Sequence, residues 1–322
     1  MNEGPASVHA GPFGSALAFR QRRARRLRTF VGVERIVLPD GRTLEYLIEG
    51  PPGGLPLVLH HGTPSGAVRY GPLFESALRH GLRLVEPSRP GYGGSSPHPG
   101  RRVADVAADT AALLDSLGAP HFVTVGWSGG GPHALACAAL LPGRCVGAAT
   151  IAGVAPYDAK GLDWLAGMGD ENIAEFQAAA AGVQPLDKFL TGMAGDLSRV
   201  TADDVVAAFG DLLSEVDKRA LTGGLADYLA ESTRYAVSAG IAGWREDDLA
   251  FLADWGFPLA DIRVPVAIWQ GDQDRMVPPA HGHWLAHHVP GAEVHLSPDE
   301  GHLSLIAGFD QIVDNLLAHI AV

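Results

Sequence analysis

The chain has 322 residues, 47% of them hydrophobic, and a formal net charge of −12. This length and apolar content predict one large domain, or a domain with an insertion, that buries a sizeable core. Residues 1–30 have a net charge of +5, whereas the rest of the chain has a net charge of −17. An acidic body repels nucleic acids and anionic membranes, so we expect neither as a partner.

The N-terminal residues are basic, with the run RQRRARRLR at 20–28. No apolar segment follows this run, so the pattern does not fit a secretory signal, and a solvated arm or first helix is favoured over a targeting or nucleic-acid-binding arm. No apolar run reaches the roughly 18 residues that span a bilayer. Cys137 and Cys145 are too few for a disulfide framework, and we expect buried thiols in a cytoplasmic protein.

The pattern of apolar residues predicts strands that alternate with helices. The segment 34–50, ERIVLPDGRTLEYLIEG, alternates on both sides of PDG, which is typical of a β-hairpin. Helical spacing is present at 103–117 and in the closing segment 306–320. This order predicts an α/β protein with a doubly wound, mostly parallel sheet. The near-continuous apolar runs that predict its buried strands are 55–62, 82–88, 121–128 and 145–153. Two further strands are expected at 264–271 and 292–298, before the closing helix.

A long helical segment interrupts this alternation. It contains no convincing strand, and its part 201–216 is expected to be a helix that Thr201 caps. An insertion here is expected to cover the carboxyl edge of the sheet, where open α/β sheets bind their ligands. The predicted organisation is a basic arm at 1–32, a core at 33–154 and 256–322, and a helical cap at 155–255.

One serine is surrounded by glycines where a predicted strand meets a predicted helix. The sequence GWSGG at 126–130 fits G-x-S-x-G, and the strand–turn–helix context is the one that this motif requires. A serine hydroxyl is a weak nucleophile by itself, so it needs a base and the base needs an orienting partner. Ser128 is therefore the candidate nucleophile.

Both partners follow later in the chain. Asp272 and Asp274 come after one predicted strand, and His302 comes after the next. Parallel strands place their carboxyl ends at one edge, so these side chains are expected near Ser128. An imidazole can take the serine proton and return it to the leaving group, while a buried carboxylate fixes its tautomer.

A further loop is expected to complete the site. Attack on a carbonyl creates an oxyanion, which needs N–H donors already in place. The stretch LVLHHGTPSG follows the first long parallel strand, so its loop should lie beside the serine turn. The backbone amides of Thr63 and Gly129 are the expected oxyanion donors, and His61 is expected beside the pocket, where it braces the loop.

The combination of HHGTP, SRPGYGGSS, GWSGGG, GDQDRMVP and EGH resembles the α/β-hydrolase superfamily from about residue 33 onward. The resemblance is to capped members with a serine nucleophile, and it implies an eight-stranded, mostly parallel sheet flanked by helices. It assigns Ser128 as nucleophile, Asp274 as acid and His302 as base, because the spacing G-x-x-D-x-x-V-P favours Asp274 over Asp272. Ser88 replaces an aspartate usual in this family, at a position that serves loop structure. Relatives that act on epoxides or haloalkanes carry an aspartate nucleophile, so Ser128 argues against both activities.

Other side chains are weaker candidates. Trp127 and Trp164 are expected to line the substrate pocket. One predicted helix is rich in histidine but lacks a glutamate-bearing zinc motif and a third ligand, so we expect a solvated face, no metal and no cofactor. Its histidines are His281, His283, His287 and His288. The segment 155–255 carries 18 acidic and 7 basic residues, which favours a solvated surface. The carboxylates that are candidates for binding a substrate ammonium instead are Asp170, Glu171 and Glu175.

The sequence therefore predicts a serine hydrolase that cleaves a carboxylic ester or lactone of a small molecule through an acyl-enzyme. An aminopeptidase similar to proline iminopeptidases is the alternative. C–C bond hydrolysis, acyl transfer and cofactor-free perhydrolysis use the same triad and stay open, as does a ligand-binding module without turnover. The sequence also leaves a homodimer open.

Overall fold

The computed structural model describes residue 1 and residues 30–320, so most of the arm predicted at 1–32 lies outside the described residues. The described strands are β1 (Phe30–Val37), β2 (Thr43–Gly50), β3 (Pro56–His60), β4 (Arg83–Pro87), β5 (Phe122–Trp127), β6 (Cys145–Ile151), β7 (Val266–Gly271) and β8 (Glu293–Ser297). They form one sheet in the order β1-β2-β4-β3-β5-β6-β7-β8. β2 pairs antiparallel with β1 and β4, and the strands from β4 through β3 to β8 are parallel. The predicted mostly parallel eight-stranded sheet is confirmed.

The antiparallel edge begins with the hairpin that the sequence predicts. β1 and β2 pair in a register that places Arg35 opposite Glu45. The turn closes through a hydrogen bond from the Leu38 N–H to the Arg42 carbonyl at 2.7 Å. Gly41 in this turn has a φ of 89°, which a residue without a Cβ adopts at little cost.

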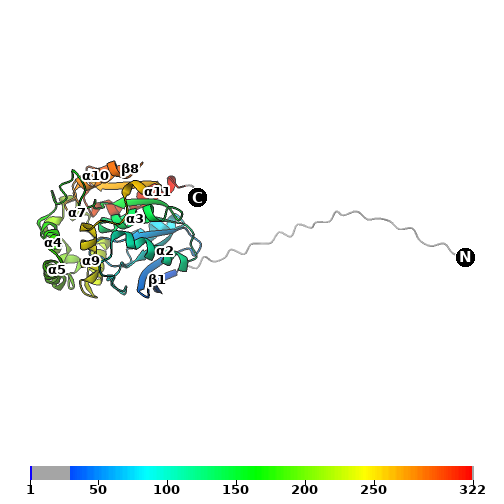
Figure 1. The fold of residues 1–322 in the computed structure, drawn as a ribbon, viewed down its shortest axis with the longest axis horizontal. Coiled ribbons are helices and arrows are strands. Elements are labelled where there is room, and N and C mark those ends of the chain that lie inside the picture. The colour runs from blue at the N-terminus through cyan, green and yellow to red at the C-terminus, as the bar shows by residue number, and fades with distance from the viewer. Residues whose placement is uncertain (2–29, 321–322) are drawn as a thin grey trace.

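Helices cover both faces of the sheet (Figure 1). The helices that pack against the sheet are α1 (Gly71–Arg79), α2 (Val106–Ser116), α3 (Gly131–Leu140), α10 (Pro279–His288) and α11 (Phe309–Ala318). Alternate residues of β3 face opposite layers: Leu57 packs in a cluster with Phe74 of α1 and Val313 of α11, whereas Val58 packs with Leu135 of α3. Burial on both faces explains why these strands are nearly continuous apolar runs.

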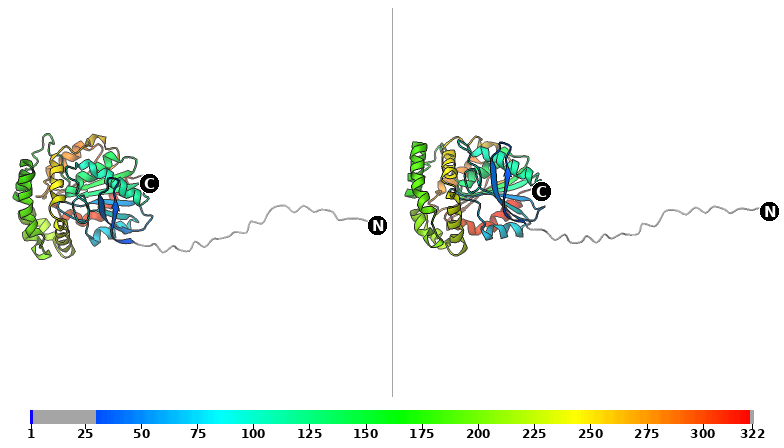
Figure 2. Two further views of the ribbon diagram at one scale, coloured as in Figure 1. Left: turned by 60° about the horizontal axis from the view of Figure 1, so that its bottom comes forward. Right: turned by 90° about the horizontal axis from the view of Figure 1, so that it is seen from below.

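Residues between β6 and β7 form only helices and loops, as the sequence predicts for this part of the chain. The helices are α4 (Asp170–Ala181), α5 (Val183–Leu197), α6 (Val205–Phe209), α7 (Glu215–Ala220), α8 (Gly224–Val237) and α9 (Ala242–Leu252). Figure 2 shows α9 (yellow) next to the core and the green helices outside it. We propose that this insertion is the cap predicted at 155–255.

The prediction of one continuous helix within the insertion is wrong. The segment 201–216 breaks after α6, because Gly210 adopts a φ of 48° and Leu213 is extended. Thr201 does begin the first short turn, where its N–H donates to Asp204 at 3.2 Å. Across the described part of the chain, no helix has both the length and the apolar character to cross a bilayer.

Candidate active site

The turn after β5 presents the serine on a strained backbone. Ser128 has a φ of 55°, in the left-handed region that residues with a Cβ rarely occupy. A Cβ placed on Gly126 would lie 2.2 Å from the Gly130 carbonyl oxygen, and one on Gly130 would lie 1.9 Å from the His60 carbonyl oxygen. Only glycine therefore lets β3, β5 and the start of α3 approach so closely around the serine.

The loops after β7 and β8 bring a carboxylate to a histidine. His302 Nδ1 lies 2.8 Å from Asp274 Oδ2, and both side chains are buried. The other oxygen, Asp274 Oδ1, accepts hydrogen bonds from the N–H groups of Met276 and Val277 at 2.9 and 2.8 Å. Asp272 is exposed to solvent, so the geometry agrees with the choice of Asp274.

The environment of His302 makes it a stronger base than a free imidazole. Burial alone lowers the pKa of His302, but the charge and hydrogen bond of Asp274 outweigh it and the charge of Asp217 adds to them, so this pKa is raised. Because Nδ1 faces the carboxylate, Nε2 is the nitrogen left for proton transfer.

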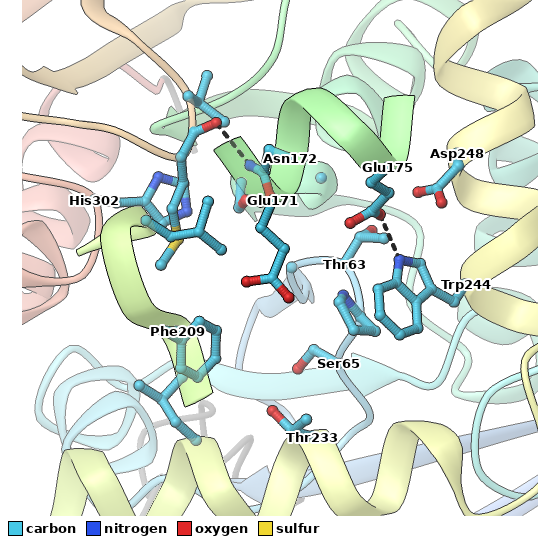
Figure 3. Close-up of a pocket in the computed structure, with 18 of the residues that line it drawn as sticks. Thr63, Ser65, Glu171, Asn172, Glu175, Phe209, Thr233, Trp244, Asp248 and His302 are labelled. Carbon is cyan, nitrogen blue, oxygen red and sulfur yellow. Dashed lines mark hydrogen bonds between the residues drawn. The ribbon is translucent and has the colours of Figure 1, made fainter. Parts of the chain in front are cut away.

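A cavity of about 130 Å³ joins these groups. Ser128, His302, Thr63 and Gly129 all line it, and most of its remaining lining is apolar. Figure 3 shows Thr63 and His302 in this cavity. Thr63 and Gly129 are in close contact, because a Cβ placed on Gly129 would lie 2.4 Å from Thr63 Oγ1. The two residues whose amides were predicted as oxyanion donors are thus brought together beside the serine.

The Thr63 loop is held by a buried carboxylate from the insertion. Thr63 Oγ1 donates to Asp247 Oδ2 at 2.7 Å and accepts from Arg89 Nη2 at 2.9 Å. Arg89 Nη2 also donates to the Gly62 carbonyl at 2.9 Å and to Asp247 Oδ2 at 2.6 Å. Asp247 lies on α9, so a helix of the insertion and a core arginine jointly fix the loop that carries the Thr63 amide.

Asp247 remains ionised although it is fully buried. Burial alone would raise its pKa, but the guanidinium groups of Arg89 and Arg101 hold the pKa of Asp247 well below its usual range. Arg101 forms an ion pair with Oδ1, and the Tyr92 hydroxyl donates to Oδ2 at 2.9 Å. A buried charge with this many donors is compensated rather than isolated.

A second carboxylate of the insertion holds the His302 loop. Asp217 of α7 is fully buried and accepts hydrogen bonds from the N–H groups of His302, Leu303 and Ser304 at 3.1, 2.7 and 3.0 Å. The Ser214 hydroxyl also donates to Asp217, at 2.8 Å. The insertion therefore supports both the predicted base and the predicted oxyanion loop.

Two of the predicted pocket residues lie elsewhere. Trp127 lines the cavity, but His61 and Trp164 do not. His61 braces its loop, as expected, because its ring nitrogens contact the Gly62 carbonyl at 2.9 Å and the Arg89 N–H at 3.3 Å. Trp164 is buried in the core, where its indole N–H donates to the Ala155 carbonyl at 2.7 Å.

The histidine-rich helix α10 also differs in part from its prediction. His281 is buried, because its ring bonds the Ala155 N–H at 3.1 Å and the Trp164 carbonyl at 2.9 Å. Burial, only partly offset by the Trp164 carbonyl, lowers the pKa of His281 to about 4. His283, His287 and His288 are exposed, as expected. In the described residues, no group of three or more His, Cys, Asp or Glu side chains is arranged to hold a metal ion.

Three carboxyl groups of the insertion line the same cavity as the serine. Glu171 and Glu175 of α4 and Asp248 of α9 are among the lining residues, whereas Asp170 is exposed and outside the cavity. Sequence reasoning considered Glu171 and Glu175 but missed Asp248, Asp247 and Asp217. Nothing in the local pattern distinguishes these three aspartates from solvated helix residues. For Arg89, which pairs with Asp247, the only signal in the sequence is the motif SRPGYGG that contains it.

Comparison with known proteins identifies the class of this chain. The family model described as alpha/beta hydrolase fold matches residues 56–309, so the chain belongs to that family. A non-heme chloroperoxidase of Streptomyces lividans is 36% identical over 148 residues, which are 45% of this chain and 54% of that protein. A pimeloyl-[acyl-carrier protein] methyl ester esterase of Aromatoleum aromaticum is 29% identical over 256 residues, 78% of this chain and 92% of that protein.

Solved structures agree with this class. A bromoperoxidase from Bacillus anthracis superposes with a TM-score of 0.64 at 22% identity, over 89% of this chain and 100% of that chain. An esterase from Rhodococcus sp. superposes with a TM-score of 0.62 at 20% identity, over 90% of this chain and 99% of that chain. At these identities the likeness shows the fold. The matches to the chloroperoxidase and to an epoxide hydrolase of Mycobacterium tuberculosis span only 54% and 44% of those relatives.

Proposed function

We propose that this protein is a serine hydrolase that cleaves a carboxylic ester or lactone through an acyl-enzyme. The observation that carries the proposal is the shared cavity: Ser128 on its strained turn and His302 line it beside Thr63 and Gly129, and His302 Nδ1 contacts the buried carboxylate of Asp274. The named activity of the methyl ester esterase relative supports the same bond type.

The reaction proceeds in two halves. Ser128 Oγ attacks the substrate carbonyl carbon while His302 Nε2 takes its proton, and the amides of Thr63 and Gly129 stabilise the oxyanion. His302 then gives this proton to the departing alcohol oxygen, which leaves the acyl group on Ser128. Water attacks the acyl group, His302 takes one of its protons, and Ser128 recovers a proton as the acid departs.

The nucleophile itself distinguishes this proposal from epoxide opening. An epoxide hydrolase is among the relatives, at 29% identity over 157 residues. Capped relatives that act on epoxides carry an aspartate nucleophile, whereas the turn here presents a serine. An alcohol leaving group also requires less protonation than an amine, which favours esters and lactones over amides.

A short-chain p-nitrophenyl ester tests the proposal. We expect turnover by the wild type, and Ser128→Ala should lower kcat by at least ~10³-fold without loss of fold. A fluorophosphonate should label the wild type at Ser128 and leave the variant unlabelled. Full activity of Ser128→Ala would refute the mechanism, and prolyl-p-nitroanilide cleaved faster than the ester would favour the aminopeptidase alternative.

A further inference from the structure

The carboxyl group of Asp248 is buried and accepts no hydrogen bond from an N–H group or a hydroxyl group of the described residues. The residue is fully buried on α9, and neither of its oxygens accepts a hydrogen bond from an amide, guanidinium or hydroxyl group of the described residues. Its polar neighbour is the carboxyl group of Glu175. A buried carboxyl group in this position is costly unless it is neutralised or receives donors from outside the protein.

Glu175 has one donor outside the pair and shares the cavity wall with Asp248. Its Oε1 accepts a hydrogen bond from the Trp244 indole N–H at 2.6 Å, and its side chain is buried. Two carboxyl groups in contact are stable only when at least one of them carries a proton. Burial, opposed by hydrogen bonds from Trp244 and Asp248, raises the pKa of Glu175 to about 7, and burial together with the charge of Glu175 raises the pKa of Asp248 well above its usual range.

The surrounding charges do not supply a cation to this pair. None of the described residues that line the cavity is a lysine or arginine. The nearby Arg101 pairs instead with Asp247, the preceding residue of α9. Glu171, one helical turn before Glu175, adds a third carboxyl group that reaches into the cavity (Figure 3). A cation for the deprotonated pair would therefore have to come from a bound ligand.

We propose that Glu175 and Asp248, with Glu171 beside them, form a subsite for a protonated primary or secondary amine on the substrate, and that amine binding releases the proton shared by the empty pair. The amine supplies the N–H donors that Asp248 lacks, which a quaternary ammonium cannot do. Most of the rest of the lining is apolar, with Phe176 and Phe251 among it, so the amine is carried on an apolar acyl or alcohol group. The identification of this ligand as a substrate rests on the proposed function.

Amine affinity should rise with pH through neutrality. The charged and titratable groups near the pair are Glu171 on α4, Asp247 on α9 with its partner Arg101, and His302 on the cavity wall. Deprotonation of the pair creates the anion that binds the ammonium, and deprotonation of His302 removes a competing positive charge. Both changes act in the same direction, and a variant of Asp248 separates them because it leaves His302 unchanged.

Calorimetry on the Ser128→Ala protein tests the subsite without turnover. The probes are n-hexylamine, 1-hexanol and hexyltrimethylammonium at pH 8, in two buffers of different ionisation enthalpy. We expect the amine to bind at least about tenfold tighter than the alcohol and the quaternary ion, which corresponds to about 1.4 kcal/mol. The difference in binding enthalpy between the two buffers gives the number of protons released, and a value close to one would support a shared proton.

Variants of the pair and a matched surface control complete the test. Asp248→Asn and Glu175→Gln should each abolish the preference for the amine, whereas Glu231→Gln, an exposed carboxylate of α8 outside the cavity, should retain it. Thermal unfolding checks that each variant is folded. Equal binding of amine and alcohol by the parent, or a preference retained by both pair variants, would overturn the proposal.

Turnover separates this inference from the proposed function. p-Nitrophenyl esters of ω-amino acids are compared with the matched n-alkanoates over several chain lengths, as the ratio of kcat/KM values. We expect the amino ester to be favoured by about tenfold at its best length, and Asp248→Asn should remove this preference. Hydrolysis of both series without preference would refute the subsite alone, whereas amine binding without any Ser128-dependent hydrolysis would refute the proposed function alone.

Discussion

Asp247 and Asp248 are neighbours on α9, both fully buried, yet their surroundings give them opposite properties. Burial raises the pKa of each carboxyl group, and two guanidinium groups reverse this effect for Asp247 alone. Asp247 receives donors from Arg89, Arg101, Tyr92 and Thr63, whereas Asp248 meets another acid. Partners therefore decide the charge state of a buried carboxyl group, and burial alone does not.

The two neighbouring residues therefore have different roles within the same helix. Asp247 connects the insertion to the core and fixes the Thr63 loop, so its hydrogen-bonding capacity is fully used within the protein. Asp248 faces the cavity with unused capacity. Asp217 and Asp274 resemble Asp247 in this respect, because fixed backbone or side-chain partners surround both of them.

The largest effect should come from a paired carboxylate next to the reacting atoms. Asp274→Asn removes the charge that orients His302 and stabilises its protonated form, so we expect kcat to fall by about 10⁴-fold. Steady-state kinetics with a p-nitrophenyl ester measures the loss. Asp272→Asn is the matched control in the same loop, and a larger effect there would show that the acid is misassigned.

Asp247→Asn should strongly destabilise the protein. It leaves Arg89 and Arg101 buried without their counter-ion, for which we expect a loss of about 3–5 kcal/mol in the free energy of unfolding. Urea denaturation measures this loss. Asp248→Asn, one residue further, replaces an acid that has no cationic partner, so no buried cation loses its counter-ion. It should lower the free energy of unfolding by less than ~1 kcal/mol near neutral pH. Equal losses in the two variants would break the comparison between these residues.

Asp217→Asn should affect catalysis through the position of His302. It weakens hydrogen bonds from backbone amides to a charged group, each worth about 1.5–3 kcal/mol, so we expect kcat to fall about ten- to a hundredfold. In the wild type, kcat/KM falls as the pH drops through the raised pKa of His302, because the base becomes protonated. Loss of the Asp217 charge should move this acid limb to lower pH, and exposed Asp227→Asn should not. An unmoved limb with unchanged kcat would limit Asp217 to a structural role.

The smallest expected effect concerns the pH dependence of stability. A carboxyl group whose pKa is raised by folding stabilises the fold below its unfolded pKa, and this contribution is lost as the pH rises through its folded pKa. Burial and the charge of Glu175 raise the pKa of Asp248 well above its usual range, and Asp248→Asn removes this group. The stability of the wild type should therefore decline relative to the variant as the pH rises above about 4, the ordinary pKa of an unfolded aspartate. We expect a relative change of about 1–3 kcal/mol, since one pKa unit corresponds to about 1.4 kcal/mol. Parallel stability curves for the two proteins would contradict a shared proton.

Local patterns in the sequence predicted the elements and the main residues of the site. Apolar runs fixed the buried strands, and the glycines around Ser128 indicated a turn whose close approaches exclude a Cβ. The prediction of one helix at 201–216 was wrong, because the spacing of apolar residues continues across Gly210, where the backbone of the helix breaks. Trp164 was placed in the pocket because an aromatic residue is equally suited to a cavity wall and to a buried core.

The sequence by itself determined the fold class and the order of Ser128, Asp274 and His302, because both depend on periodicity and on motifs read along a few residues. Only the tertiary structure decided which acids of the insertion are structural and which are free. Asp247 meets Arg89 across 158 positions of sequence, and Asp217 meets the His302 amide across 85. A carboxyl group acquires its charge state from such distant partners, so the contrast between Asp247 and Asp248 exists only in the folded chain.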